Sequence, residues 1–325
     1  MLIHFNLDEH DREQIRYLAL SIAKECDNLE EIFFLTNAAV CAQELPRNIR
    51  RLFYSFKMSE TAPGLLLTNN PVSAQDVGPT PSSHWRPGED RPLNLPQIIH
   101  GLYAALLGEV FGFDTQQRGR LFNDLISIPG AASNSSSGDG KVGLHTEDIS
   151  QTQPFMPDYL GFLCLRNEQK AVTTLSSLQG ISIPDATRRT LFEQCFPFRS
   201  GEQRPILFGD PGRPYLRISP VEYERCSAEM LAARQLLMEA LHRNQQTITL
   251  GQGDCLYLDN SFAVHGRAPF SAEYGAKSRW FSRVFVLRDL RRIRPFTASS
   301  ESRIMVASNG TTVPNWPKAA SAFSA

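Results

Sequence analysis

The sequence predicts a mainly β fold, a sandwich or barrel with helical additions. The main observation is a set of eight short apolar runs after Gly119, separated by glycine, proline and aspartate. Long helices do not alternate with these runs as regular βαβ units would require. The predicted strands are 121–128, 142–149, 159–165, 172–175, 206–208, 248–250, 255–258 and 280–286.

The second observation is helical spacing in the first part of the chain. From residue 8 to about residue 57 the apolar residues recur every three or four positions, as in Ile15, Leu18 and Ile22. Turn formers dominate 68–96, which predicts a long loop, and the apolar stretch 97–113 predicts a mostly buried helix. Two further helices are expected near 186–194 and 221–243.

A chain of 325 residues with 42% hydrophobic residues can bury one large core. We therefore expect one domain, 1–325. Its parts are a mostly helical N-terminal portion and loop (1–113), a β core (119–292) with a helical insert at about 186–244, and a loose C-terminal tail (295–325).

Charge and composition exclude several classes of partner. Thirty-three basic and 34 acidic side chains leave a net charge of −1, so nucleic acid is not an expected partner. No apolar run approaches the ~20 residues that span a bilayer, and the N-terminus carries acids where a secretory signal needs basic residues. The six cysteines form no CxxC pair and are expected to be buried, reduced thiols. These features predict a cytoplasmic protein that does not enter membranes.

Three residues form a candidate metal site. His145 and Glu147 stand two apart in a predicted strand, so both side chains point to the same face. His265 lies far downstream at the end of a predicted strand, beside Gly266. Two imidazoles and one carboxylate leave three octahedral positions open, which suits iron(II), whereas zinc would more often add a third histidine or a cysteine. Each fragment alone also recurs by chance.

A further motif supports the interpretation that the protein is a metal-dependent enzyme. Arg279 follows His265 by fourteen residues and opens an apolar strand. A guanidinium there is costly unless it faces a carboxylate, so Arg279 is a candidate anchor for a dicarboxylate. The remaining histidines have no partner at ligand spacing and are expected to be surface or packing residues: His4, His10, His84, His100 and His242.

From about residue 64 to residue 292 the chain resembles the clavaminate synthase-like iron(II)/2-oxoglutarate oxygenases, which include free arginine, asparagine and lysine hydroxylases. The segments that carry the resemblance are GLLLTNNPVSAQDVGPTP, QRGRLFNDLISIPG, HTED with PDYLGFLCLRNE, LFGDPGRPYLRIS, LDNSFAVHGRAPF and SRWFSRVFVLRDL. The resemblance implies a double-stranded β-helix (jelly-roll) core that holds iron through His145, Glu147 and His265. It implies that Arg279 binds the far carboxylate of the cosubstrate 2-oxoglutarate, helped by Thr173 in preference to Thr174.

The function that the resemblance implies uses Fe(II), 2-oxoglutarate and O2. It is hydroxylation of an unactivated side-chain carbon of a free polar or basic L-amino acid, of the lysine, arginine or asparagine type, in specialised metabolism. Glu147 argues against halogenation, since related halogenases have a small residue there. The alternatives are the same chemistry on a peptide or an amino acid tethered to a carrier protein, desaturation or cyclisation, and a non-catalytic jelly-roll binding protein.

Three residues are candidates for substrate binding. Asn123 matches a family position that contacts the amino-acid head group, although such an amide also caps its own backbone. Arg283 would bind the substrate carboxylate or pair with Asp289. Asp210, in a lid-like segment at 208–214, would meet a cationic side chain or form an ordinary turn. Ile218 and Ser219 follow the Leu-Arg pair where arginine hydroxylases carry an acid, which weakens the case for guanidinium recognition.

Overall fold

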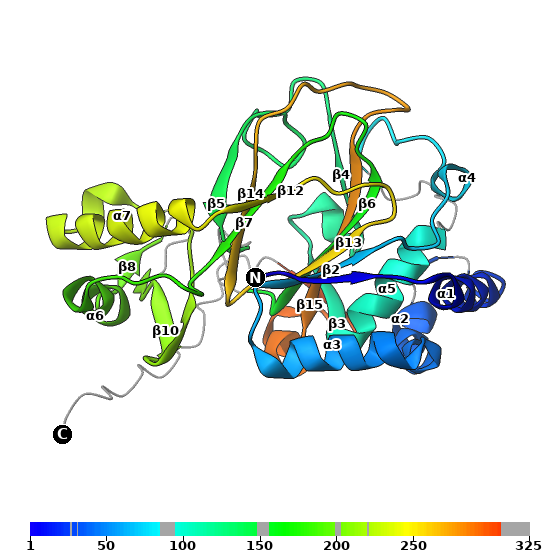
Figure 1. Cartoon of the computed structure of the whole chain (residues 1–325), viewed down its shortest axis with the longest axis horizontal. Coiled ribbons are helices and arrows are strands. Elements are labelled where there is room, and N and C mark those ends of the chain that lie inside the picture. Colours follow the sequence, from blue (N-terminus) through cyan, green and yellow to red (C-terminus); the bar gives the residue numbers. More distant parts are fainter. Residues whose placement is uncertain are drawn as a thin grey trace.

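The structure is a computed structural model that describes residues 1–26, 28–30, 32–84, 95–147, 156–198, 203–219 and 221–306. Two β sheets lie in its centre, with helices on both sides of the pair (Figure 1). The larger sheet has the order β1-β2-β13-β6-β15-β3-β16, with β4 also paired to β15, and the smaller has the order β12-β7-β14-β5.

The strands of the larger sheet are β1 (Ile3–Asn6), β2 (Gly64–Thr68), β3 (Glu109–Phe113), β4 (Asn123–Ile126), β6 (Tyr159–Arg166), β13 (Cys255–Asp259), β15 (Trp280–Leu287) and β16 (Ile304–Met305). Those of the smaller sheet are β5 (Val142–His145), β7 (Thr173–Ser177), β12 (Gln246–Ile248) and β14 (Ala263–Arg267). Two hairpins stand apart from both sheets: β8 (Phe196–Pro197) with β9 (Gln203–Arg204), and β10 (Leu207–Asp210) with β11 (Arg213–Leu216).

The α-helices are α1 (Glu9–Ile22), α2 (Ile32–Cys41), α3 (Arg47–Ser59), α4 (Ala74–Val77), α5 (Leu95–Leu107), α6 (Asp185–Glu193) and α7 (Ala228–Arg243). Short 3-10 turns are η1 (Ala42–Glu44), η2 (Gln117–Gly119), η3 (Tyr223–Arg225) and η4 (Leu290–Phe296). Helices α1, α2, α3 and α5 cover the larger sheet, and α6 and α7 lie beyond the smaller one (Figure 1).

Successive side chains of a strand point to opposite faces, so each strand contributes to two cores. On β15, Phe281 and Phe285 enter the core between the sheets, whereas Val284 and Val286 pack beneath the helices. Arg279 and Arg283 share the odd-numbered face with these phenylalanines. The fold therefore directs two guanidinium groups into the space between the sheets.

Seven of the eight predicted runs overlap a strand by two residues or more, whereas 248–250 shares only Ile248 with β12. Five strands that the sequence did not predict complete the sheets: β1, β2, β3, β14 and β16. The predicted helix at 97–113 is wrong beyond Leu107, because a side chain at Gly108 would lie 2.1 Å from the carbonyl oxygen of Leu287 and the chain turns there into β3. His265 lies in the middle of β14, not at a strand end.

The ends of the predicted segments also differ from the structure. The segment from 186 to 244 contains the β8–β9 and β10–β11 hairpins as well as α6 and α7. The loose tail predicted from residue 295 is wrong as far as Met305, because β16 pairs with β3 in parallel, and 307–325 lie outside the described residues. All six cysteines are free, but only Cys26, Cys164 and Cys255 are buried, whereas Cys41 and Cys226 are partly exposed and Cys195 is exposed. In the part of the chain that the structure describes, no helix has the length and apolar character to cross a membrane.

Candidate active site

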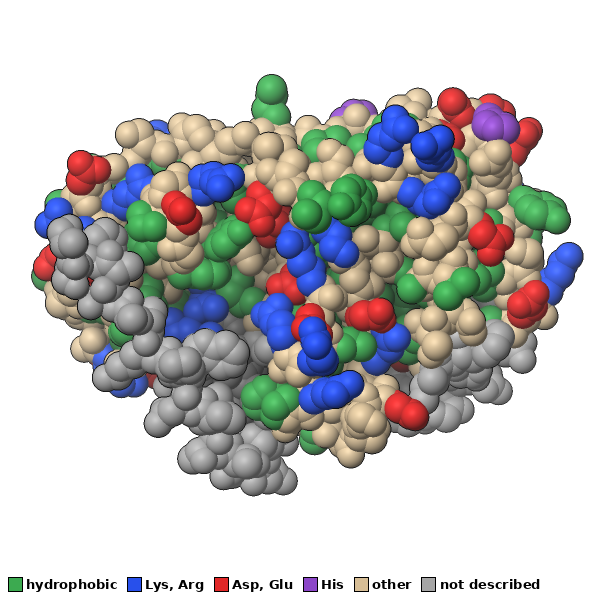
Figure 2. Space-filling view, turned by 90° about the horizontal axis from the view of Figure 1, so that it is seen from below, with side chains coloured by type: hydrophobic (Ala, Val, Ile, Leu, Met, Phe, Trp, Pro, Cys, Tyr) green, Lys and Arg blue, Asp and Glu red, His purple; other side chains and the backbone are tan. Residues whose placement is uncertain are grey.

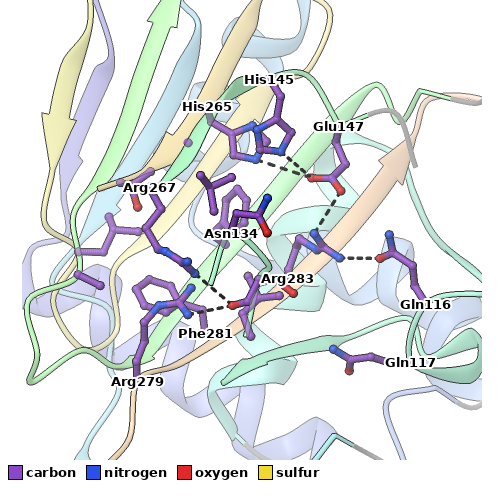
Figure 3. A pocket seen from close by; sticks show the side chains of 18 of the residues that line it. Gln116, Gln117, Asn134, His145, Glu147, His265, Arg267, Arg279, Phe281 and Arg283 are labelled. Atoms are coloured by element: carbon purple, nitrogen blue, oxygen red, sulfur yellow. Dashed lines mark hydrogen bonds and ion pairs between the residues drawn. The ribbon is translucent and has the colours of Figure 1, made fainter. Parts of the chain in front are cut away.

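The two sheets bring His145, Glu147 and His265 together. His145 is the last residue of β5 and stands directly opposite His265 of β14, with the ring centroids 4.4 Å apart. Glu147 follows β5, and its Oε2 lies 3.8 Å from His145 Nε2 and 3.7 Å from His265 Nε2 (Figure 3). Within the described ranges this is the one group of three such side chains arranged to hold a metal ion.

The ring nitrogens of the two histidines are oriented for metal binding. The Nδ1 of His145 lies 2.9 Å from the carbonyl oxygen of Gly143, which only accepts, so Nδ1 is the donor of this hydrogen bond and Nε2 is the nitrogen directed at Glu147. Burial, together with His145 and Arg283, holds the pKa of His265 well below its usual range. The Nε2 atoms of both imidazoles face the Glu147 carboxylate, and the three side chains form a donor set that fits iron(II).

Arg283 holds the second oxygen of the Glu147 carboxylate. Its Nη1 donates to Glu147 Oε1 at 3.3 Å, and its Nη2 donates to Gln116 Oε1 at 2.6 Å and to Asn123 Oδ1 at 3.1 Å. Burial lowers the pKa of Arg283, and Glu147 opposes this shift. Arg283 does not pair with Asp289, whose carboxylate accepts from the exposed Arg291 instead.

Asn260 is a supporting residue that the sequence reasoning missed. It is buried just beyond β13, where its Oδ1 accepts from the backbone N–H of Glu147 at 2.8 Å. Its Nδ2 donates to the carbonyls of Glu147 at 2.9 Å and Pro157 at 3.0 Å. The only signal in the sequence is its place in the Asp-Asn-Ser turn that leads into β14.

Replacing Asn260 with alanine is expected to weaken iron(II) binding about 10–100-fold, the usual loss when a group that orients a metal ligand is removed. Stability should also fall by about 1–3 kcal/mol, because buried backbone groups lose their partners. Anaerobic iron titration and thermal unfolding measure the two effects. Asn244→Ala is the control: its Nδ2 donates to the carbonyls of Ser177 and Gln179, so it should lose stability without losing iron affinity. Equal iron affinity in both variants would contradict the prediction.

One cavity of about 520 Å³ connects the three candidate ligands with Arg279. Phe162, Phe281 and Leu125 form apolar walls, and Gln116, Asn134 and Ser136 add polar groups. Figure 3 shows Asn134 between the candidate ligands and Arg279. Thr173 lines the cavity as well.

Arg279 is a buried cation at the far end of this cavity. Its Nη1 donates to the carbonyl of Ser136 at 3.2 Å, and its guanidinium lies 5.0 Å from the centroid of Phe281. Burial, aided by the neighbouring Arg267, lowers the pKa of Arg279 to about 9. A desolvated guanidinium beside a second one favours an anion in the cavity.

Two predicted substrate residues do not line the cavity. Asn123 is buried behind Arg283, and its Nδ2 donates to the backbone carbonyl of Arg120 at 2.7 Å, so its amide supports Arg283 and its own turn. Asp210 is exposed at the β10–β11 turn, where it accepts from the N–H groups of Gly212 and Arg213. Conversely, His84 lines the cavity and contacts the Ser137 hydroxyl, which the sequence reasoning did not foresee.

A second cavity, of about 250 Å³, lies between α3, the β10–β11 hairpin and the end of β13. Charges of both signs line it, and Figure 2 shows the two signs interleaved on the face that α3 crosses. Tyr215 donates to the Glu60 carboxylate here and ties the hairpin to the end of α3. Asp259 is buried in the wall, and burial raises its pKa to about 6.

The buried carboxyl group of Asp259 makes the free energy of unfolding depend on pH. Its pKa in the fold lies above the unfolded value of about 3.9, so the folded state binds more protons and stability falls as the pH rises towards 6 and beyond. Asp259→Asn removes this loss and still accepts from the N–H of Ser261. The advantage of the variant in unfolding free energy should grow by about 1 kcal/mol between pH 5 and 7.5. Denaturant unfolding at both pH values measures it, and a constant difference would refute the assignment.

Known proteins with similar chains are oxygenases. No protein-family model matches the chain. It is 27% identical to enduracididine beta-hydroxylase of Streptomyces hygroscopicus, covering 94% of this chain and 100% of that one. It is 28% identical to L-ornithine/L-arginine 3-hydroxylase of Catenulispora acidiphila, covering 92% and 98%. Clavaminate synthase 2 of Streptomyces clavuligerus is 28% identical, with 79% and 84% covered, which confirms the resemblance drawn from the motifs.

The fold is similar as well. The crystal structure of the non-heme iron oxygenase OrfP in complex with Fe and alpha-ketoglutaric acid superposes with a TM-score of 0.85 at 29% identity, covering 93% of this chain and 99% of that one. The sheet-rich fold with flanking helices is therefore that of non-heme iron oxygenases.

Proposed function

We propose that this protein is an iron(II)/2-oxoglutarate-dependent dioxygenase that hydroxylates the side chain of a free polar or basic L-amino acid. The observation that carries the proposal is one cavity with His145, Glu147 and His265 at one end and the buried Arg279 at the other. Bound iron would supply the chemistry that couples oxidative decarboxylation of the keto-acid cosubstrate to insertion of oxygen into a C–H bond. The chain as a whole is one oxygenase domain, with the two sheets as its jelly-roll core.

Other residues of the cavity bind the cosubstrate and exclude water. Arg279 holds the far carboxylate of the cosubstrate 2-oxoglutarate, helped by Thr173, which lines the same cavity and pairs with Arg267 across β7 and β14. Phe162 and Phe281 keep water from the reacting end of the cosubstrate. His145, Glu147 and His265 would hold the iron(II), each with one ligand atom.

The amino-acid substrate takes the part of the cavity near Arg283. This guanidinium binds the substrate carboxylate, with Gln116 and Asn123 holding its other N–H groups in place. The names of the relatives support a free amino acid, since they include hydroxylases of enduracididine and of ornithine and arginine. Asp210 would reach a cationic side chain only if the β10–β11 hairpin moved, because its carboxylate is engaged in the turn.

The test is to load the protein with iron(II) without oxygen, add 2-oxoglutarate, admit oxygen, and measure succinate and product mass. The substrates are the twenty L-amino acids, ornithine and enduracididine. One amino acid that stimulates succinate release and gains one oxygen would establish the hydroxylase. Loss of two hydrogens instead would indicate desaturation or cyclisation. Bound iron and 2-oxoglutarate without stimulation would shift the assignment to a carrier-tethered amino acid or a peptide, and failure to bind either would leave a non-catalytic binding protein.

A further inference from the structure

The cavity contains a third arginine, Arg267, that none of the roles above uses. It lies on β14 two residues after His265, so both side chains share the inner face of the strand. Its side chain is buried, and it lines the cavity next to Arg279 (Figure 3). Both guanidiniums lie over the ring of Phe270, at 5.2 and 5.6 Å from its centroid.

Arg267 donates hydrogen bonds to the connection between β4 and β5. It donates to the carbonyls of Gly140 at 2.8 Å, Ser133 at 3.3 Å and Ser136 at 3.3 Å. A guanidinium presents a rigid fork of donors, so it can hold three carbonyls that a single ammonium group could not match. These contacts fix residues 133–140, which we call the serine loop, against β14.

The contacts of Arg267 add to the backbone hydrogen bonds that the serine loop makes within itself, such as that from Gly140 N–H to the carbonyl of Ser133. Its sequence, SNSSSGDG, consists of residues that favour turns and chain flexibility. The loop is also tightly folded on itself, since a side chain at Gly138 would lie 2.2 Å from the carbonyl oxygen of Ala132. Asn134 and Ser136 from this loop form one wall of the cavity. Any loss of order in the loop would therefore open the site.

Arg267 and Arg279 share one acceptor, the carbonyl oxygen of Ser136. When Arg279 turns its N–H groups to an incoming carboxylate, this carbonyl loses one donor. The second donor, from Arg267, keeps it satisfied. The two arginines therefore have different roles. Arg279 is able to bind the anion, while Arg267 keeps the cavity wall that contains Ser136 in place.

We propose that Arg267 is a positioning residue that fastens the serine loop, and with it Asn134, to the wall of the active site while Arg279 engages the cosubstrate. This proposal rests on the proposed function for its kinetic consequences, though not for the loop contacts themselves. It predicts that loss of Arg267 affects the amino-acid substrate more than 2-oxoglutarate. The reacting carbon would be held less well, so succinate would form without product.

The first experiment measures the loop and needs no activity. Hydrogen exchange of the serine loop is compared in the wild type, Arg267→Met and Arg267→Lys. Both variants are expected to exchange about tenfold faster or more in the loop, since charged hydrogen bonds to carbonyls are lost and lysine lacks the fork. Ser136→Ala keeps the carbonyl and should match the wild type. Unchanged loop protection in both arginine variants, with the fold intact, would overturn the proposal.

The second experiment measures steady-state kinetics with the amino acid found above. Arg267→Lys is expected to raise the KM for the amino acid about tenfold and the ratio of succinate to hydroxylated product several-fold, with a smaller change in the KM for the cosubstrate. A larger change for the cosubstrate than for the amino acid would assign Arg267 to 2-oxoglutarate binding and overturn the proposal. If the wild type itself forms no succinate, the proposed function fails, whereas the exchange experiment still decides the role of Arg267.

Discussion

Replacing His265 with alanine is expected to reduce iron(II) affinity and succinate formation by more than about a hundredfold. Removing a group that only orients a metal ligand usually lowers metal affinity or activity by about 10–100-fold. His265 is placed as a ligand itself, so its loss should have a larger effect. Its Nε2 faces the Glu147 carboxylate at 3.7 Å, and its suppressed protonation keeps it ready for a metal at neutral pH. Anaerobic iron titration and succinate release measure the two losses.

The control for this variant is His242→Ala, which removes an exposed histidine at the end of α7 that contacts the Met238 carbonyl. It should bind iron and turn over like the wild type. Removing iron from the wild type with a chelator should abolish activity, and adding iron back should restore it. Retained iron affinity in His265→Ala with a folded protein would remove the metal site from the proposed function.

The candidate ligands could be predicted because their residue types and short spacings are visible in the sequence. His145 and Glu147 are two residues apart in a predicted strand, and Arg279 follows His265 by fourteen residues at the start of another. What the sequence could not provide is the pairing that aligns His265 with His145 across β14 and β5. That register depends on contacts between segments more than a hundred residues apart.

The missed strands have physical reasons. Strand β2 has three successive leucines, Leu65, Leu66 and Leu67, all buried because one face packs under the helices and the other meets the core between the sheets. It therefore lacks the apolar and polar alternation that marks a half-exposed strand. Strand β3 follows the buried helix α5 with only Gly108 between them, and the close packing of Gly108 against Leu287 ends that helix.

The supporting residues were the hardest to predict. Asn260 acts through backbone groups of Glu147, which leaves no pattern in the sequence. The sequence left two interpretations of Asp210 open, a contact with a cationic side chain and an ordinary turn, and the structure contains the turn. Asn123 reaches the site only through Arg283, a relation set by the pairing of β4 with β15.

Replacing Arg279 with alanine is expected to raise the KM for the cosubstrate 2-oxoglutarate by at least about a hundredfold, because a buried charged partner of a carboxylate is worth roughly 3–5 kcal/mol. Iron affinity should change little, since Arg279 lies at the end of the cavity away from the candidate ligands (Figure 3). Arg283→Lys is the matched comparison. This variant should raise the KM for the amino acid rather than the KM for the cosubstrate, because Arg283 lies beside Glu147, where the substrate carboxylate is proposed to bind.

A shortened cosubstrate assigns the effect to one carboxylate. 2-Oxobutyrate keeps the keto acid that would bind the metal and lacks the far carboxylate. The wild type should prefer 2-oxoglutarate strongly in kcat/KM, and Arg279→Ala should lose nearly all of this preference while using 2-oxobutyrate about as well as the wild type does. If the variant still discriminates between the two keto acids, another cation holds the far carboxylate. Arg267, the neighbouring guanidinium at that end of the cavity, would then be the residue to replace next.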